Sequence, residues 1–362
     1  MFNPTRLTLA RQRRGLKKTQ LAQQAKLTVR SVSAYEAGDT VPTDATIGEL
    51  ARILRFPVAF FSATSLDTLT TESASFRALS SMTAGQRDAA MGAGTLAIAL
   101  SEWIASRFNL PEADLADLRG HAPEAAADAL RGAWGLGERP VKNMVHLLEA
   151  HGVRVFSLVE ECKEVDAFSL WRGSVPFVFL NTIKTAERGR FDAAHELGHL
   201  VLHRHGAPQG RAAEHEADTF ASCFLMSRGS ILANAPRLPS VDLLLKLKRN
   251  WNVSVTALAH RLHAVDLMTD WHYRMLCIEM AKRGYKRSEP NGIPRETSQL
   301  LQKVFQTLRD EGVSKTEVAR QLHMDVAELD SLVFGLVMTP LQGGKSPSGG
   351  DPRSARAHLR LV

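Results

Sequence analysis

A chain of 362 residues is too long for one ordinary hydrophobic core, so its length predicts two or three domains. Hydrophobic residues make up 44% of the sequence and charged residues 23%, a balance typical of globular proteins that excludes disorder over most of the chain. The net charge is +7, and residues 1–62 supply +6 of it, with ten Lys and Arg against four Asp and Glu. A basic segment on an otherwise neutral chain is typical of a nucleic-acid-binding module joined to something else.

The sequence also limits the compartment in which the protein is expected. No stretch has the order of a signal peptide, and none approaches the roughly 20 apolar residues that span a bilayer. The three cysteines, Cys162, Cys223 and Cys277, are widely spaced and odd in number, which argues against a disulfide framework or a zinc ribbon. These features predict a cytoplasmic protein without a membrane partner.

The first 62 residues carry the pattern of a helix-turn-helix. Four segments have the composition and spacing of short helices: residues 6–14, 19–26, 29–36 and 47–54. The second and third flank a tight turn at Leu27–Thr28, as in a helix-turn-helix. With T-Q at residues 19–20 and Y-E-A-G at 35–38, this order resembles the XRE/Cro-type family over about residues 4–61. The alternative is a helical protein-contact module, which the charge excess disfavours.

The resemblance implies binding to a double-stranded DNA operator through the second helix of the motif. Thr28 can cap this helix, and Val29, Val32 and Tyr35 are expected to pack inward. The residues expected to contact the duplex are Gln20, Thr28, Arg30, Ser31 and Ser33. Specific recognition of two half-sites would normally require a homodimer.

The middle of the chain predicts a linker, helices and a small sheet. Residues 62–75 are rich in Ser and Thr, as linkers are, and residues 85–135 are Ala-rich and helical, with Pro111 and Pro123 as interruptions. Trp103, Ile104 and Phe108 are expected to form one buried stripe. A helix over residues 141–151 and three strands over 153–158, 167–171 and 176–180 follow, with a hairpin at 172–174. A strand of this sheet could hold an extended peptide by backbone pairing.

Residues 185–204 read as one long helix that carries His195-Glu196-Leu197-Gly198-His199. A spacing of four residues places both imidazoles on one helix face, where they can converge on one metal ion. Glu196 lies beside the first histidine and can take a proton from a water molecule at the metal. This short motif predicts metal-dependent hydrolysis, but a catalytic metal usually needs a third protein ligand.

The third ligand is expected on the acidic helix that begins near residue 212. Glu214 and Glu216 are two residues apart and point to different sides of a helix, so both cannot bind one ion. Glu214 lies four residues before Asp218, the gluzincin-like arrangement in which the Glu binds metal and the Asp orients a ligand histidine. We therefore choose Glu214, keep Glu216 as the alternative with a solvated role favoured, and expect His203 to support a ligand or to touch substrate.

Residues 195–203 (HELGHLVLH) and 214–226 (EHEADTFASCFLM) together resemble the ImmA/IrrE family of metallopeptidases over about residues 140–270. The resemblance implies an endopeptidase that cuts a transcriptional repressor of a mobile element or a stress response. The family usually has proline where this chain has Ser227, a difference that concerns helix termination. A His₂Glu ligand set suits Zn²⁺ best and also tolerates Mn²⁺.

Helical patterns continue towards the C-terminus over residues 241–263 and 271–282. Residues 312–322 echo residues 15–25, and residues 326–334 supply a second helix, which predicts a second helix-turn-helix-like unit. Because this second helix is acidic, we favour a packing or protein-contact role over DNA binding. The Gly-, Ser- and Pro-rich run over 343–356 predicts a flexible tail.

The sequence thus predicts a mostly α, multidomain fold with a helical helix-turn-helix bundle, a small α+β zincin-like (gluzincin) metallopeptidase domain and a helical C-terminal region. The expected bounds are 1–62 for the DNA-binding domain, 63–80 for the linker, 81–270 for the peptidase domain, 271–342 for the C-terminal region and 343–362 for the tail. The expected function is that of a DNA-binding regulator that makes a limited cut in a protein partner. The alternatives are a regulator whose metal domain is a sensor or scaffold, and self-processing at the linker.

Overall fold

The computed structural model describes residues 1–69, 82–158, 167–204, 210–285 and 288–337, and the backbone of 357–358. It is mostly helical with a small three-stranded sheet, which confirms the expected fold class. Residues 70–80 of the expected linker and most of the expected tail lie outside the described residues. Within the described part of the chain, every helix is too short or too polar to cross a bilayer.

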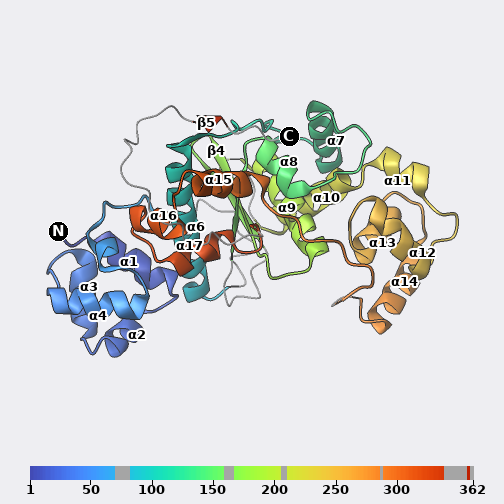
Figure 1. The fold of residues 1–362 in the computed structure, drawn as a ribbon. Coiled ribbons are helices and arrows are strands. Elements are labelled where there is room, and N and C mark those ends of the chain that lie inside the picture. Colours follow the sequence, from blue (N-terminus) through green and yellow to red (C-terminus); the bar gives the residue numbers. More distant parts are fainter. Residues whose placement is uncertain (70–81, 159–166, 205–209, 286–287, 338–356, 359–362) are drawn as a thin grey trace.

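The N-terminal domain is a bundle of four helices that lies at one end of the molecule (Figure 1). The elements are α1 (Pro4–Arg13), α2 (Lys18–Gln24), α3 (Val29–Ala37), α4 (Asp44–Leu54) and the 3₁₀ turn η1 (Val58–Ser62). Thr28 caps α3 as expected, because its hydroxyl accepts a hydrogen bond from the Ser31 N–H at 3.0 Å. Val32 is fully buried and Tyr35 partly, but Val29 is 44% exposed, so its predicted inward packing is wrong. As the first residue of α3, Val29 lies at the surface.

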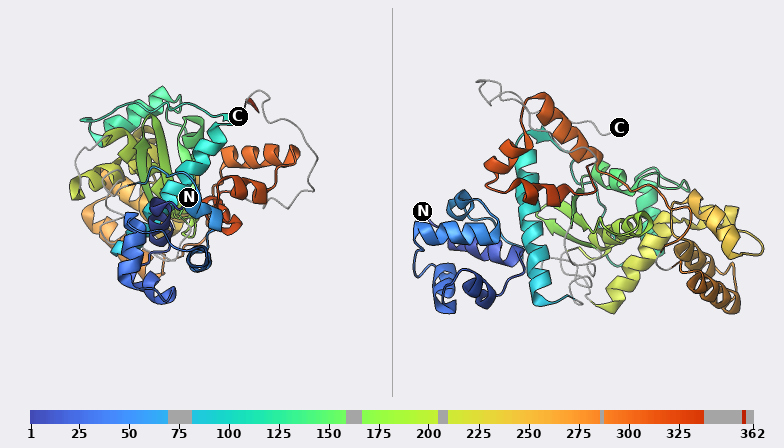
Figure 2. Two further views of the ribbon diagram at one scale, coloured as in Figure 1. Left: turned by 90° about the vertical axis from the view of Figure 1, so that its left-hand side faces the viewer. Right: turned by 60° about the horizontal axis from the view of Figure 1, so that its bottom comes forward.

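The long helix α6 (Ala84–Ala105) stands between the N-terminal domain and the sheet (Figure 2). Glycines allow α1 to pack closely against it. A Cβ on Gly85 would lie 2.8 Å from the Gly15 carbonyl oxygen, and one on Gly92 would lie 3.0 Å from Arg13 Cα. The N-terminal domain is therefore packed directly on the rest of the molecule.

The expected buried stripe near the end of α6 holds for Ile104 and Phe108 but not for Trp103. Trp103 is only partly buried, with the Arg107 guanidinium 3.9 Å from its ring centroid. Pro123 begins α7 (Pro123–Ala133) and does not interrupt a helix, since the first turn of a helix tolerates the missing N–H. The short strand β1 (Phe108–Asn109) pairs in parallel with β5 (Ala357–His358), in the segment expected to be a flexible tail.

Three strands form the sheet in the order β2-β4-β3, with a hairpin turn at Gly173–Ser174. They are β2 (Arg154–Ser157), β3 (Ala167–Arg172) and β4 (Val175–Leu180), close to the predicted bounds. β2 runs parallel and β3 antiparallel to β4, so β3 lies at one end of this sheet. Helix α9 (Ala186–Leu202) packs on β3 and β4, and α10 (Arg211–Leu225) packs on α9 and α7.

A helical lobe lies at the opposite end from the N-terminal domain (Figure 1). It contains α11 (Arg228–Asn234), α12 (Val241–Leu247), the 3₁₀ turn η3 (Lys248–Asn250), α13 (Val255–Ala264) and α14 (Asp270–Lys282). The helical pattern predicted over residues 241–263 is therefore broken at η3 and at Asn252, which has φ 54°. Lys248 is fully buried there, with Nζ 3.3 Å from Glu187 and 2.6 Å from Glu289.

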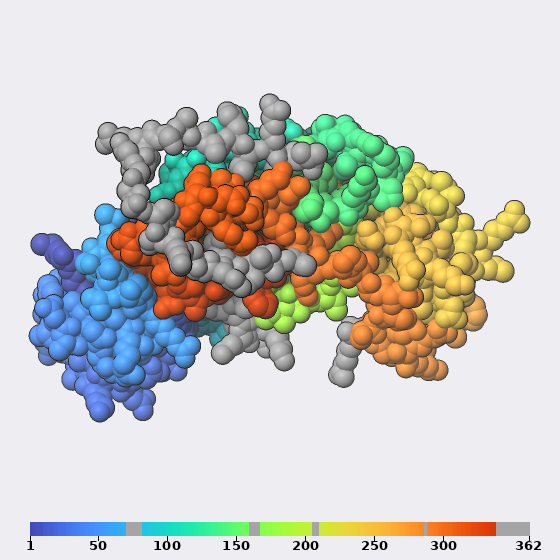
Figure 3. All heavy atoms as spheres, viewed as in Figure 1, coloured from blue at the N-terminus to red at the C-terminus, as the bar shows by residue number. Residues whose placement is uncertain are grey.

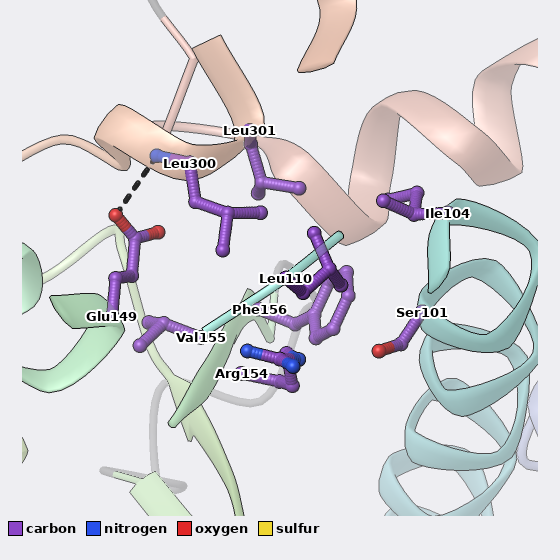
Figure 4. Close-up of a pocket in the computed structure, with 9 residues that line it drawn as sticks. All are labelled: Ser101, Ile104, Leu110, Glu149, Arg154, Val155, Phe156, Leu300 and Leu301. Carbon is purple, nitrogen blue, oxygen red and sulfur yellow. Dashed lines mark hydrogen bonds between the residues drawn. The ribbon is translucent and has the colours of Figure 1, made fainter. Parts of the chain in front are cut away.

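The helices α15 (Gln299–Asp310), α16 (Lys315–Gln321) and α17 (Val326–Val333) fold back onto the face of the molecule next to the N-terminal domain (Figure 3), where α17 contacts β2 and α15 contacts α8 (Met144–Ala150). Glu149 of α8 caps α15 by accepting hydrogen bonds from the Gln299 and Leu300 N–H groups, each at 3.0 Å. Figure 4 shows Leu300 and Glu149 on the wall of a small cavity that also borders β2. Burial raises the pKa of Glu149 to about 7.

The acidic helix α17 contacts the N-terminal domain through a buried ion pair. Oε1 of Glu328 accepts from Arg13 Nε at 2.5 Å, and Oε2 accepts from Arg14 Nη1 at 2.8 Å. The side chains of Arg13 and Glu328 are each 2% exposed. The acidic residues that argued against DNA binding by this helix thus include Glu328, which pairs with Arg13 of α1.

Candidate metal centre

Three potential ligands converge where α9 and α10 cross. The Nε2 atoms of His195 and His199 lie 3.1 Å apart, and the Glu214 carboxylate oxygens lie 3.3 Å from the first and 3.5 Å from the second. Bonds of about 2.0–2.1 Å in a tetrahedral site would separate the ligand atoms by about 3.3 Å, so this donor set fits a zinc-sized ion. Gly198 permits the helices to approach, since a Cβ there would lie 3.0 Å from the Phe220 ring.

Asp218 fixes the orientation of His195. The Nδ1 N–H of His195 points at Asp218 Oδ1 at 2.9 Å, which leaves Nε2 facing Glu214. Burial disfavours the imidazolium of His195, but hydrogen bonds to Asp218 and Glu214 outweigh it and raise the pKa to about 10 without metal. Burial raises the pKa of Glu214, but hydrogen bonds from the two histidines outweigh this and hold it well below its usual range. The cluster is therefore ready to exchange a proton for a cation.

A second chain of hydrogen bonds orients His199. His203 Nε2 donates to Glu216 Oε2 at 2.8 Å, and His203 Nδ1 lies 2.9 Å from His199 Nδ1. Burial lowers the pKa of His203, which favours a neutral ring whose Nδ1 accepts the proton of His199 Nδ1. This arrangement leaves His199 Nε2 free to face the cluster. Glu216 is therefore outside the metal cluster, yet it is not simply a solvated side chain.

Glu196 is buried beside the cluster and is held by a residue that the sequence patterns did not single out. Ser169, on β3, donates its hydroxyl proton to Glu196 Oε2 at 2.6 Å. Both residues are buried, at 3% and 4% exposure. The signal in the sequence was a lone hydroxyl between Phe168 and Leu170 in an otherwise apolar strand. The strand expected to lie beside the metal helix thus also supplies a hydrogen bond to its central glutamate.

The residues expected to contact DNA are all at least partly exposed on the N-terminal domain. Gln20, Thr28 and Arg30 are exposed, and Ser31 and Ser33 are partly exposed. Two of them also have local roles, because Gln20 accepts from the Lys17 N–H at 2.8 Å and Thr28 bonds with the Ser31 hydroxyl at 2.8 Å.

Some of the basic side chains of the N-terminal domain are paired inside the protein. Arg11 pairs with Glu36 at 2.5 Å, and Arg13 and Arg14 both pair with Glu328. Glu36 is already included in the count over residues 1–62, so of these partners only Glu328 lowers the excess of the domain, from +6 to +5. Arg30 and Arg55 are among the basic residues that remain exposed.

The fold and the cluster define a two-part protein, in which a helix-turn-helix module is joined to a domain of the metallopeptidase class. The comparisons with known families agree with this description: residues 5–59 match the helix-turn-helix domain, and residues 148–263 match the IrrE N-terminal-like domain, a peptidase family. No curated protein matches the sequence. The chain thus carries the two domains that its sequence resembled. Ser227, at the usual proline position, is the N-cap residue that precedes α11.

Proposed function

We propose that this protein is a cytoplasmic DNA-binding regulator whose metal-dependent endopeptidase domain makes a limited cut in a protein partner. The partner that fits a helix-turn-helix regulator best is a transcriptional repressor of a mobile element or a stress response. The observation that supports catalysis is the placement of Glu196, a buried carboxylate beside the His/His/Glu cluster that is outside the ligand set.

In this proposal His195, His199 and Glu214 hold the metal, with Zn²⁺ preferred and Mn²⁺ tolerated. A bound ion would supply Lewis acidity and lower the pKa of water towards neutrality. Glu196 accepts the proton of the attacking water and later donates it to the leaving amine, while Ser169 fixes the position of its carboxylate. Among the described strands β3 lies at an edge of the sheet, and this edge would pair with the backbone of an extended substrate.

The DNA-binding part of the proposal rests on the exposed residues of α2 and α3. Gln20, Thr28, Arg30, Ser31 and Ser33 would contact an operator, with a homodimer reading two half-sites. The domain boundaries that we propose are the same as those expected from the sequence. Since the described part of the N-terminal domain is packed on α6, the operator and the metal centre would be held in a fixed relation.

A regulator whose metal domain senses or scaffolds without proteolysis is the second candidate function. The helix-turn-helix domain favours it, because DNA binding alone would explain a regulatory role. The two candidates predict different behaviour for a Glu196→Gln variant that still binds metal. The peptidase proposal requires this variant to lose regulation of its target promoter. Equal repression and induction by this variant and the wild type would favour the scaffold.

Self-processing near the linker is a third outcome that can be tested directly. Purified protein is incubated with Zn²⁺ or Mn²⁺ and followed by mass spectrometry of the intact chain. A shortened species that forms over time and is absent for Glu196→Gln supports self-processing, whereas a mass that stays constant opposes it.

A further inference from the structure

A large cleft opens next to the metal centre, between the α9–α10 pair and the helical lobe. Its volume is about 820 Å³, within the range of pockets that bind ligands. One wall comes from α9 and α10, and the other from α13, α14 and residues near Tyr285. The volume exceeds that of a single side chain, so the cleft has room for a short peptide segment.

The cleft is continuous with the surroundings of the metal ligands. Asp218, whose Oδ1 orients His195, also lines the cleft. Thr219 and Ser222 follow Asp218 along the same side of α10 and line it further. On α9, Phe191 lies one helical turn before His195 and borders the same space. A chain bound at the metal could therefore extend into this cleft.

The charged groups around the cleft have partners within the protein but keep a negative excess, because two glutamates share one lysine. Glu187 and Glu289 both pair with the buried Nζ of Lys248, and Arg188 pairs with Asp192 at 2.9 Å. Burial also lowers the pKa of His260, which favours its neutral form. A negatively charged occupant would lose hydration in the cleft without gaining a counter-charge from these groups.

Aromatic rings border the cleft on both sides. Phe191 lies on α9, Tyr273 on α14 and Tyr285 just beyond it. Tyr273 is held by stacking on His263, with ring centroids 4.5 Å apart. The small side chain of Ala257 leaves space between these rings and the hydroxyls of α10. Such a lining suits an aromatic side chain, which stacks on rings and can donate to a hydroxyl.

We propose that this cleft binds the segment of a protein substrate next to the cleaved bond, and that it selects a segment that contains an aromatic residue and lacks acidic side chains. This inference rests on the proposed endopeptidase activity, since it gives that activity its sequence preference. Phe191, Tyr273 and Tyr285 are the residues that determine specificity.

The test uses the zinc-loaded full-length protein and a mixture of peptides from a digested proteome, with cleavage sites read by mass spectrometry. Ala257→Trp fills the cleft from α13. Ala264→Trp is the matched control, because Ala264 is an exposed alanine on the same helix and outside the lining. Zinc content and the thermal midpoint of each variant are measured first. Tyr273→Ala, which removes a ring from a partly exposed position, replaces Ala257→Trp if that variant does not fold.

Wild type and Ala264→Trp are expected to cut peptides with an aromatic residue enriched at one fixed position, and Ala257→Trp to cut them about tenfold more slowly. Tyr273→Ala is expected to weaken the aromatic preference. A second arm measures retention of the same peptides by the zinc-loaded Glu196→Gln variant, with and without Ala257→Trp. We expect about tenfold less retention of aromatic peptides when the cleft is filled.

The two arms separate the cleft from the proposed activity. Retention of aromatic peptides that Ala257→Trp abolishes, without cleavage by the wild type, would support the cleft and overturn the endopeptidase. Cleavage without an aromatic preference, or equal cleavage by Ala257→Trp, would overturn the cleft and support the endopeptidase. The absence of both retention and cleavage would overturn both proposals.

Discussion

His195 Nδ1 lies 2.9 Å from Asp218 Oδ1, across the crossing of α9 and α10. This contact leaves Nε2 of the imidazole directed at Glu214, with the tautomer that a metal ligand requires. In the proposed site, this aspartate on α10 keeps the histidine on α9 in an orientation that can bind metal.

Replacement of this aspartate should weaken metal binding without unfolding the protein. For Asp218→Asn we expect a loss of about 10–100-fold in zinc affinity, because His195 loses its carboxylate partner. Competition with a chromophoric chelator measures the affinity. Asp242→Asn is the control, since Asp242 is an exposed aspartate paired with Arg283 in the distant lobe. Equal affinities for both variants would contradict the orienting role.

The pKa of His195 predicts how zinc binding varies with pH. Because the pKa is raised from 6.5 to about 10 in the metal-free protein, a proton must leave His195 when the ion binds. Apparent zinc affinity should therefore rise about tenfold per pH unit between about pH 7 and 9. Calorimetry in buffers of different ionisation enthalpy should show the released proton. A pH-independent affinity in this interval would show that His195 is already neutral.

The same pKa directions predict the stability of the metal-free cluster. The contribution of His195 is fully present below about pH 6.5 and is lost as the pH rises through about 10. The contribution of Glu214, whose pKa is lowered from 4.5, is present above about pH 4.5 and is lost in more acidic solution. Thermal midpoints of the chelator-treated protein should therefore fall on the alkaline side, and added zinc should reduce this fall.

Removal of the hydroxyl of Ser169 should affect turnover more than metal binding. The Ser169→Ala variant leaves the buried Glu196 carboxylate without its 2.6 Å donor, so we expect up to about a tenfold lower kcat with zinc affinity unchanged. Ser174→Ala provides the control, because Ser174 is exposed at the turn of the same hairpin. An unchanged kcat for Ser169→Ala would show that the hydrogen bond only supports the fold.

The Glu328 contact predicts a strong effect on the docking of the N-terminal domain. Glu328→Ala leaves the buried Arg13 guanidinium without its carboxylate, which should cost about 3–5 kcal/mol in the free energy of opening. Hydrogen exchange of α1 and α17 measures that opening. Glu317→Gln should cost at most about 1 kcal/mol, because its ion pair with Arg320 is exposed. Similar exchange in both variants would mean that the pair contributes little.

The sequence predicted the structural features that depend on local periodicity. The H-E-x-x-H helix was predicted from a spacing of four residues, the hairpin from a spacing of two, and the helix-turn-helix from a turn of a few residues. Local backbone geometry determines all three of these spacings. Val29 was misplaced because an apolar residue at the start of a short helix can lie on either side of its boundary. Ser169 was missed because its partner Glu196 is 27 residues away, and only the packing of α9 on β3 brings them together.

The charge count pointed to the helix-turn-helix module, but it could not show which basic residues are paired inside the protein. Arg13 and Arg14 counted towards a DNA-binding surface, yet their partner Glu328 is more than 300 residues away in the sequence. Composition cannot show which charges pair across the fold. The second helix-turn-helix-like pattern near the C-terminus was visible from residues 312–334, but its contact with α1 required the structure.

The most direct test of the account compares new protein N-termini in cells that express the wild type or Glu196→Gln under inducing conditions. Both proteins are first shown to bind zinc equally. The account predicts at least one defined new N-terminus, within a transcriptional repressor, that appears with the wild type and is absent with Glu196→Gln. Identical sets of N-termini, together with identical regulation of the target promoter, would contradict it.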